Sequence, residues 1–192
     1  MVSIFPLITI FAPLLGTLLI SLFWRDLGDR VARLGIAALW CSALTSLATL
    51  AVVLSGDTIQ LALIGAPSGT MTYTVMVDRL AAVMMALISL VSLIIHVYSE
   101  RYMVGDAGYV RFFALLGGLT FVLLSLVSSG NLFWLFVCWH LVTWLLARLL
   151  VCNPDSRAAR DAGQKTFWVQ SFGDAAFAVA LLVLYGSYGT WD

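Results

Sequence analysis

The chain has 192 residues, of which 62% are hydrophobic and 10% charged, and its formal net charge at pH 7 is zero. A soluble domain has about 45–50% apolar and about 25% charged residues, so a water-soluble protein of this length cannot bury so much apolar surface. The zero net charge and the lack of a long basic run also exclude an electrostatic surface for nucleic acid. These observations predict an integral membrane protein whose apolar side chains face lipid.

Long apolar stretches alternate with short polar ones along the whole chain. The hydrocarbon core of a bilayer requires about 20 apolar residues for each crossing helix. Six segments reach that length, and we therefore predict an all-α, polytopic membrane protein. The predicted helices cover residues 2–23, 34–55, 75–99, 110–128, 131–152 and 166–186.

The connections between these segments carry charged or turn-forming residues. Residues 24–30 form a short charged turn, and residues 105–108 and 128–131 contain turn-forming residues. The longer stretch 56–74 contains glycine, proline and threonine and predicts a small hairpin lying on the membrane surface. In 153–156, the proline cannot extend the fifth helix, whereas an aspartate or serine can cap the sixth.

Basic residues are distributed unequally between the connections. The first, third and fifth connections hold them, whereas the second and fourth hold none apart from Arg79 at the edge of the third helix. Since lysine and arginine collect in short cytoplasmic loops, we predict that the odd connections are cytoplasmic and that both chain ends lie outside. Arg148, one turn from the inner end of the fifth helix, can extend to the cytoplasmic interface. The basic residues of the first, third and fifth connections are Arg25, Arg30, Arg33, Arg101, Arg111, Arg157, Arg160 and Lys165.

Two ionisable side chains lie in the middle of predicted helices, where a charge costs at least ~2.5–3.5 kcal/mol. His140 is nine residues, or about 13 Å, from the outer end of the fifth helix, and Asp174 is twelve residues, or about 18 Å, from the outer end of the sixth. The short connection makes these helices antiparallel neighbours, so side-chain reach or one water can bridge the offset of about 5 Å. The pair is either a proton relay or a structural hydrogen bond that joins the helices, and both interpretations remain open.

Other polar and small residues have simpler predicted roles. His96 lies near the cytoplasmic end of the third helix, where water is close, and is predicted to anchor the interface rather than to conduct ions. Asp78 is predicted to complement the N-terminus of the same helix. Gly117 and Gly118 predict close packing of the fourth helix. Trp139 is too deep for an interfacial belt and is predicted to pack inside the bundle.

The sequence contains no pattern that indicates a cofactor, a metal ion or catalysis. Cys41, Cys138 and Cys152 lie in or at the ends of apolar runs, without metal-ligand spacing, and are predicted to be small buried hydrophobic residues. There is no nucleotide-binding loop and no Ser/His/Asp arrangement. We therefore expect no cofactor, no bound metal and no catalytic site in this chain alone.

Two motifs connect the chain to a known family. Residues 77–84 read VDRLAAVM, and residues 96–113 read HVYSERYMVGDAGYVRFF. The first is similar to the VDGLSxxM pattern, and the second to the H-x-Y-S…Y-M-x-G-D-x-G-Y-x-R-F-F pattern, of the antiporter-like proton-channel family. That family includes the NuoL subunit of respiratory complex I and subunits of Mrp antiporters. The resemblance runs from residue 77 to 186, and the predicted external N-terminus fits it independently.

The resemblance implies a proton pathway through this chain. Asp174 and Lys165 match family landmarks, whereas His140 stands where the family normally has a glutamate, and Ser171 where it often has an arginine. In the family, that glutamate pairs with a lysine on a seventh helix, which would lie beyond the last residue here. The implied pathway residues are therefore His140, Asp174, Lys165 and Ser171, with His96 and Arg148 as possible interface or channel residues.

The resemblance also implies two parts and a longer protein. Residues 1–74 are expected to form an N-terminal helix pair with an outer loop, and residues 75–192 the start of the antiporter-like channel domain. The chain stops at 187–192, within what reads as a connection. It is therefore expected to be the N-terminal part of a longer protein.

Within the family, the chain is similar to one divergent branch. The missing glutamate, together with the stretches 148–150 and 153–159, resembles DabB, the membrane subunit of two-component inorganic-carbon transporters. The large cytoplasmic partner in that branch, DabA, is a zinc protein akin to carbonic anhydrases. This resemblance implies a proton- or sodium-conducting subunit of the cell inner (plasma) membrane that energises bicarbonate or CO₂ uptake. Two alternatives remain open: a subunit of complex I or of an Mrp antiporter, and a structural membrane anchor that has lost its channel.

Overall fold

The computed structural model describes residues 4–56, 58–64, 73–106, 108–151 and 156–191. Six helices in this described part are long and apolar enough to cross a membrane, which confirms the prediction of a polytopic helical membrane protein. A short 3-10 turn (Gly28–Arg30) joins the first two helices, and strands β1 (Ile59–Ile64) and β2 (Tyr73–Val77) form an antiparallel hairpin. The helices are α1 (Ile4–Leu27), α2 (Val31–Leu54), α3 (Arg79–Tyr102), α4 (Tyr109–Val127), α5 (Leu132–Leu150) and α6 (Arg157–Tyr188).

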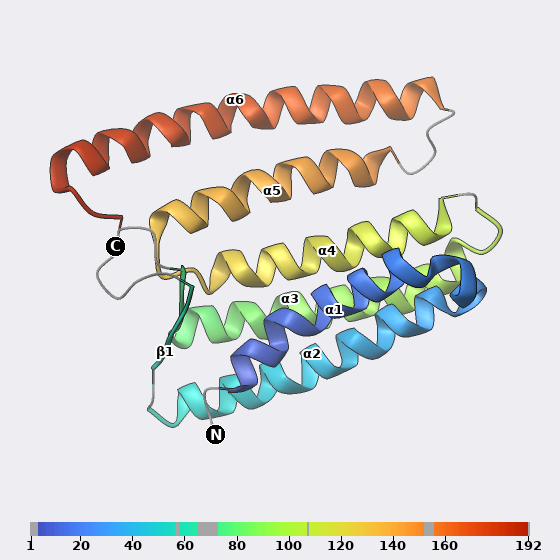
Figure 1. Cartoon of the computed structure of the whole chain (residues 1–192), viewed down its shortest axis with the longest axis horizontal. Helices are drawn as coiled ribbons and strands as arrows, with labels where there is room; N and C mark the ends of the chain where they lie inside the picture. Colours follow the sequence, from blue (N-terminus) through green and yellow to red (C-terminus); the bar gives the residue numbers. More distant parts are fainter. Residues whose placement is uncertain (1–3, 57, 65–72, 107, 152–155, 192) are drawn as a thin grey trace.

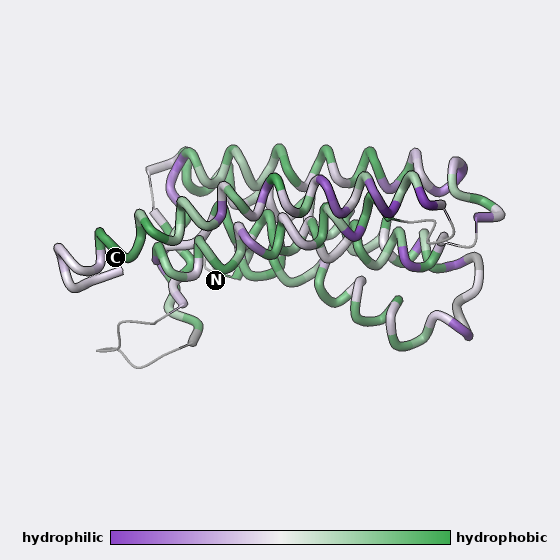
Figure 2. Tube along the Cα trace, turned by 90° about the horizontal axis from the view of Figure 1, so that it is seen from above, coloured by the Kyte–Doolittle hydropathy of each residue, from purple (hydrophilic) through white to green (hydrophobic). Residues whose placement is uncertain are grey.

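The helices form a bundle with two layers added at one side (Figure 1). Helix α1 packs on α2 and α4, α2 packs on α3, and α5 lies between α4 and the outermost helix α6. The start of α1 and the end of α6 lie at the same end of the bundle, as an even number of crossings requires. Figure 2 shows hydrophobic residues along most of the bundle and more hydrophilic residues toward the opposite end.

Two predicted helix boundaries are wrong. Helix α3 begins at Arg79 rather than at residue 75, because residues 73–77 form β2. Helix α6 begins at Arg157 rather than at residue 166, because four of its first nine residues are charged and hydropathy detects only the apolar part of a helix. With 32 residues, α6 is about 48 Å long and exceeds the hydrocarbon thickness of about 30 Å.

The helix caps agree with the sequence. Oδ1 of Asp78 accepts a hydrogen bond from the backbone N–H of Ala81 at 2.7 Å, and Oγ of Ser156 accepts one from Ala159 at 3.3 Å. The predicted proline stop after the fifth helix lies outside the described residues. Gly117 confirms the predicted close packing, since a Cβ there would lie 2.5 Å from Oγ1 of Thr17 on α1.

Hydroxyl groups join the first helices across their interfaces. Oγ1 of Thr9 on α1 donates to Thr45 on α2 at 2.9 Å, and Ser46 on α2 shares a hydrogen bond of 2.7 Å with Ser89 on α3. Hydrogen bonds between small polar side chains are a common means of helix association in lipid. The sequence analysis assigned these residues no role.

The predicted hairpin exists, but its second strand does not simply rest on the membrane surface. The backbone N–H of Met76 donates to the carbonyl of Ser128 at 2.8 Å, and that of Gly130 donates to the carbonyl of Thr74 at 2.9 Å. Val75 and Val77 are fully buried in a core cluster with residues of α1, α2, α3 and α4. The hairpin therefore closes one end of the bundle. The division of the chain at residues 74 and 75 stays a prediction, although β2 runs across it.

Membrane orientation can be tested with single cysteines. The native Cys138 is buried as predicted, whereas the prediction for Cys41 is wrong, since its side chain is exposed on α2; Cys152 lies outside the described residues. In a cysteine-free full-length background, Gln60→Cys in β1 should react with an impermeant thiol reagent added outside intact cells, because the hairpin is predicted to be external. Arg157→Cys at the start of α6 should react only after the cells are opened. External labelling of Arg157→Cys would contradict the predicted orientation.

Candidate functional site

Only a narrow face of helix α6 packs against the rest of the molecule, and that face contains a carboxylate. In the described part of α6 only three residues are buried, namely Gly163, Asp174 and Leu181. Asp174 is 4% exposed. A buried carboxylate is costly unless hydrogen bonds or an opposite charge compensate it. Its partners are therefore the central feature of the α5–α6 interface.

Two adjacent residues of α5 bind the two carboxylate oxygens of Asp174. Nδ1 of His140 lies 2.8 Å from Oδ2, and the indole Nε1–H of Trp139 donates to Oδ1 at 2.9 Å. Hydrogen bonds to an ionised acceptor are among the stronger ones in proteins. The predicted neighbours thus meet by direct contact, without a bridging water.

The two halves of the pair differ in their exposure. The Asp174 side chain is 6% exposed, whereas that of His140 is 48% exposed. Only Nδ1 of His140 takes part in a hydrogen bond with the described residues. Nε2 is therefore the atom at which His140 can exchange a proton with a further group.

Aromatic rings hold the α5 side of the pair. Phe136 stacks on His140 with ring centroids 6.5 Å apart and an interplanar angle of 21°. Phe177, one turn after Asp174 on α6, contacts both Phe136 and Trp139 with centroid separations of 5.7 and 6.0 Å. These contacts restrict the rotation of the two side chains that bind the carboxylate.

A cavity of about 690 Å³ adjoins the pair between α4, α5 and α6. Its walls are mostly apolar, but Trp139 and Asp174 line it together with Thr143 and Gln170. Oε1 of Gln170 and Oγ of the neighbouring Ser171 are buried and have no hydrogen-bond partner among the described residues. Leaving such a group unsatisfied costs about 1–3 kcal/mol, so each of these two side chains favours a polar partner close to Asp174.

The other predicted pathway residues lie farther away. Lys165 is exposed on α6, nine residues before Asp174, which corresponds to about 13 Å along the helix. Arg148 is exposed at the end of α5, and its guanidinium lies over the ring of Trp144 at 5.0 Å. Neither residue contacts the pair, and their place in a proton pathway stays a prediction.

The predicted position of His96 at a watery interface is wrong. His96 is fully buried, its Nδ1–H donates to the carbonyl of Ser92 at 2.9 Å, and its ring lies 5.7 Å from that of Phe113 on α4. Helix α3 continues to Tyr102, which places His96 well inside the helix. Gly35 on α2 lets the ring approach closely, because a Cβ there would lie 3.3 Å from Cδ2 of His96.

Three residues at the site were not predicted from the sequence: Trp139 as a hydrogen-bond donor, Thr143 and Gln170. The role of Trp139 could have been predicted, because an indole N–H in the middle of the membrane needs a hydrogen-bond acceptor. Thr143 follows Trp139 by four residues and so lies on the same face of α5. Nothing in the sequence indicated that Gln170 would line a cavity with them.

Comparisons with known proteins agree with this architecture. The N-terminus of chain 5 of NADH-ubiquinone oxidoreductase (complex I) matches residues 65–113. The chain is 37% identical over 187 residues to a probable inorganic carbon transporter subunit, DabB1, of Halothiobacillus neapolitanus, covering 94% of this chain and 32% of that protein. It is 32% identical to an NAD(P)H-quinone oxidoreductase subunit 5 of Paulinella chromatophora, covering 100% of this chain and 29% of that protein.

A solved structure shows the same fold. A chain of the membrane-bound sulfane sulfur reductase, an archaeal respiratory membrane complex, superposes with a TM-score of 0.87 at 18% identity, covering 97% of this chain and 38% of that chain. The present chain thus spans about a third of the length of these relatives. Over that length, its resemblance to the antiporter-like membrane subunits of the complex I chain 5 type is confirmed.

Proposed function

We propose that the chain is the N-terminal part of a proton- (or sodium-) conducting subunit of the cell inner membrane that energises inorganic-carbon uptake. One observation carries the conducting role: His140 and Asp174, each near the middle of a membrane-spanning helix, are in direct contact at 2.8 Å. Ionisable groups at this depth are costly and usually mark ion pathways.

The geometry supports a simple exchange of protons at His140. The imidazole binds Asp174 through Nδ1 and offers Nε2 to a water or to a further side chain. A proton that arrives at Nε2 produces an imidazolium, and the Asp174 carboxylate stabilises its charge through Nδ1–H. Loss of that proton from Nε2 restores the neutral ring. Trp139 keeps the carboxylate in place throughout, because its N–H occupies the other oxygen.

The same contact offers one explanation for both departures from the family pattern. A glutamate at position 140 would place two carboxylates together, and like charges at this distance require a compensating cation. In the family, that glutamate pairs with a lysine on the seventh helix, and the arginine often found at position 171 adds a second cation. With His140, the net charge of the pair is zero when the imidazole is protonated. No cation is then needed at position 171, where this chain has Ser171.

The carbon-uptake role rests on the similarity to DabB1 over nearly the whole chain. We propose a large cytoplasmic zinc protein of the DabA type as the partner. The full-length protein, co-expressed with a zinc protein of the DabA type, should restore growth in air to a host that lacks carbonic anhydrase. It should also co-purify with that zinc protein. Co-purification with quinone-reducing subunits and no restored growth would contradict the proposal.

That contrary result would favour a second candidate, a proton-translocating subunit of a redox-driven complex or an Mrp-type antiporter. Several similar proteins carry names of this kind. One is F420H2 dehydrogenase subunit L of Methanosarcina mazei, which is 41% identical over 111 residues and covers 56% of this chain and 16% of that protein. The His140–Asp174 pair would then serve an oxidoreductase without itself binding a redox centre.

A further inference from the structure

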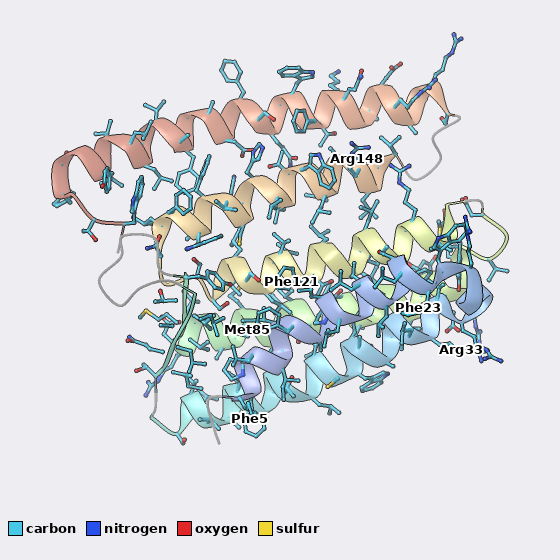
Figure 3. The ribbon with its side chains drawn as sticks, viewed as in Figure 1. Phe5, Phe23, Arg33, Met85, Phe121 and Arg148 are labelled. Atoms are coloured by element: carbon cyan, nitrogen blue, oxygen red, sulfur yellow. The ribbon has the colours of Figure 1, made fainter. Side chains whose placement is uncertain are left out.

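A second cavity, of about 380 Å³, lies between the ends of α4, α5 and α6 and gathers positive charge. Arg111 near the start of α4, Arg148 near the end of α5 and Arg160 in the first turn of α6 all line it. These residues are far apart in the sequence and come from three different helices. The cavity lies at the end of the bundle where Arg33 and Arg148 are found, which is the end predicted to be cytoplasmic (Figure 3).

The described residues leave this charge uncompensated. Among the residues that the structure describes, no aspartate or glutamate lines the cavity. The ion pairs of the described part join Arg33 to Glu100 and His140 to Asp174, and neither involves the three arginines. Three guanidinium groups around one cavity repel one another, so an anion is the complementary occupant.

Apart from Gln164, the remaining side chains that line the cavity are apolar. They are Trp144 and Ala147 from α5, Val151 directly after α5, and Phe167 from α6. Arg148 is held against the Trp144 ring by a cation–π contact of 5.0 Å, which orients one of the charges. Charged groups above an apolar wall match a ligand with an anionic head and a hydrocarbon tail.

A groove for that tail continues toward the membrane centre. The larger cavity beside Asp174 begins within one helical turn, since Thr143 and Val169 line it next to Trp144 and Phe167 of the smaller one. Its walls are again mostly leucine, valine and aromatic side chains from the same three helices. Both cavities thus lie along the same α4–α5–α6 seam.

We propose that Arg111, Arg148 and Arg160 bind the phosphate of an anionic phospholipid whose acyl chain follows this seam. A guanidinium group can donate two parallel hydrogen bonds to the oxygens of one phosphate. Basic pockets between membrane helices on the cytoplasmic side bind anionic lipid head groups. The site does not depend on which ion the protein conducts.

The test measures lipid binding to the purified full-length protein in detergent by native mass spectrometry. Cardiolipin and dioleoyl phosphatidylglycerol are compared with dioleoyl phosphatidylcholine and with inorganic phosphate. The variant R111Q/R148Q/R160Q should bind cardiolipin at least tenfold more weakly than the unmodified protein. The control R30Q/R101Q/R157Q removes the same charge from exposed arginines near the same end and should bind normally.

Size-exclusion profiles and thermal stability without lipid establish that the variants fold. If the triple variant does not fold, the single variant Arg148→Gln replaces it and should lose at least threefold in affinity. Equal affinity of the folded cavity variant and the control would overturn the site. Binding of inorganic phosphate as tight as that of cardiolipin would overturn its assignment to a lipid.

Discussion

Replacing His140 with alanine, or Asp174 with asparagine, should reduce ion-driven transport by the full-length protein to background. The single change leaves the other member of a bonded pair without its partner at mid-membrane depth. Removing one partner of such a pair typically costs several kcal/mol, whereas removing both is often milder. The double variant should therefore be no worse than either single variant, as expected for residues that act as one unit. Uptake of inorganic carbon, or growth that depends on it, is the measurement.

A matched control separates lost conduction from lost folding. Asp161→Asn makes the same chemical change on the same helix, but at an exposed position, and should transport normally. The amount of each variant in the membrane is measured beside its activity. If His140→Ala inserts, folds and transports at the normal rate, the relay is refuted and the interpretation as a structural helix lock is correct.

The same pair predicts how the family's own residue would behave. His140→Glu alone places a second carboxylate beside Asp174 and should keep only partial activity. His140→Glu with Ser171→Arg restores both family residues and should transport better than His140→Glu alone, because the added guanidinium compensates the extra negative charge. Equal activity of the two variants would contradict the charge argument.

Trp139→Phe should have the second-largest effect. The change keeps an aromatic ring beside Phe177 but removes the N–H that donates to Oδ1 of Asp174 at 2.9 Å. A buried acceptor that loses its partner costs about 1–3 kcal/mol. If that cost falls on the conducting state, transport should decrease about tenfold, the factor that corresponds to 1.4 kcal/mol.

Trp168→Phe is the control for this substitution. Trp168 is 71% exposed on α6 and contacts only the ring of Phe167 among the aromatic residues described. Its variant should keep normal transport and thermal stability. Identical losses in both variants would show that tryptophan at this level of the membrane acts through general packing rather than through Asp174.

The sequence by itself determined the membrane class, the number of crossings and the positions of several caps. These features depend on local properties: about 20 apolar residues are enough for a crossing, and a carboxylate such as that of Asp78 caps the helix that follows it. The asymmetry of the basic residues is local in the same sense. The motifs around residues 77–113 sufficed for the family resemblance.

Hydropathy predicted the start of α6 and the environment of His96 wrongly. Hydropathy places the start of α6, residues 157–165, in a connection because this stretch has four charged residues and no large apolar one, although Ser156 caps it as a helix. His96 was assigned to the interface from its distance to a predicted end. Its true environment depends on Gly35, a residue of another helix.

Only the tertiary structure decided which side chains meet. Spacing placed His140 and Asp174 on neighbouring helices, but the rotation of α6 about its axis brings Asp174 to both Trp139 and His140. The same rotation places Arg160 beside Arg111 and Arg148. Helix rotation and tilt result from packing over the whole interface, and no single segment of sequence specifies them.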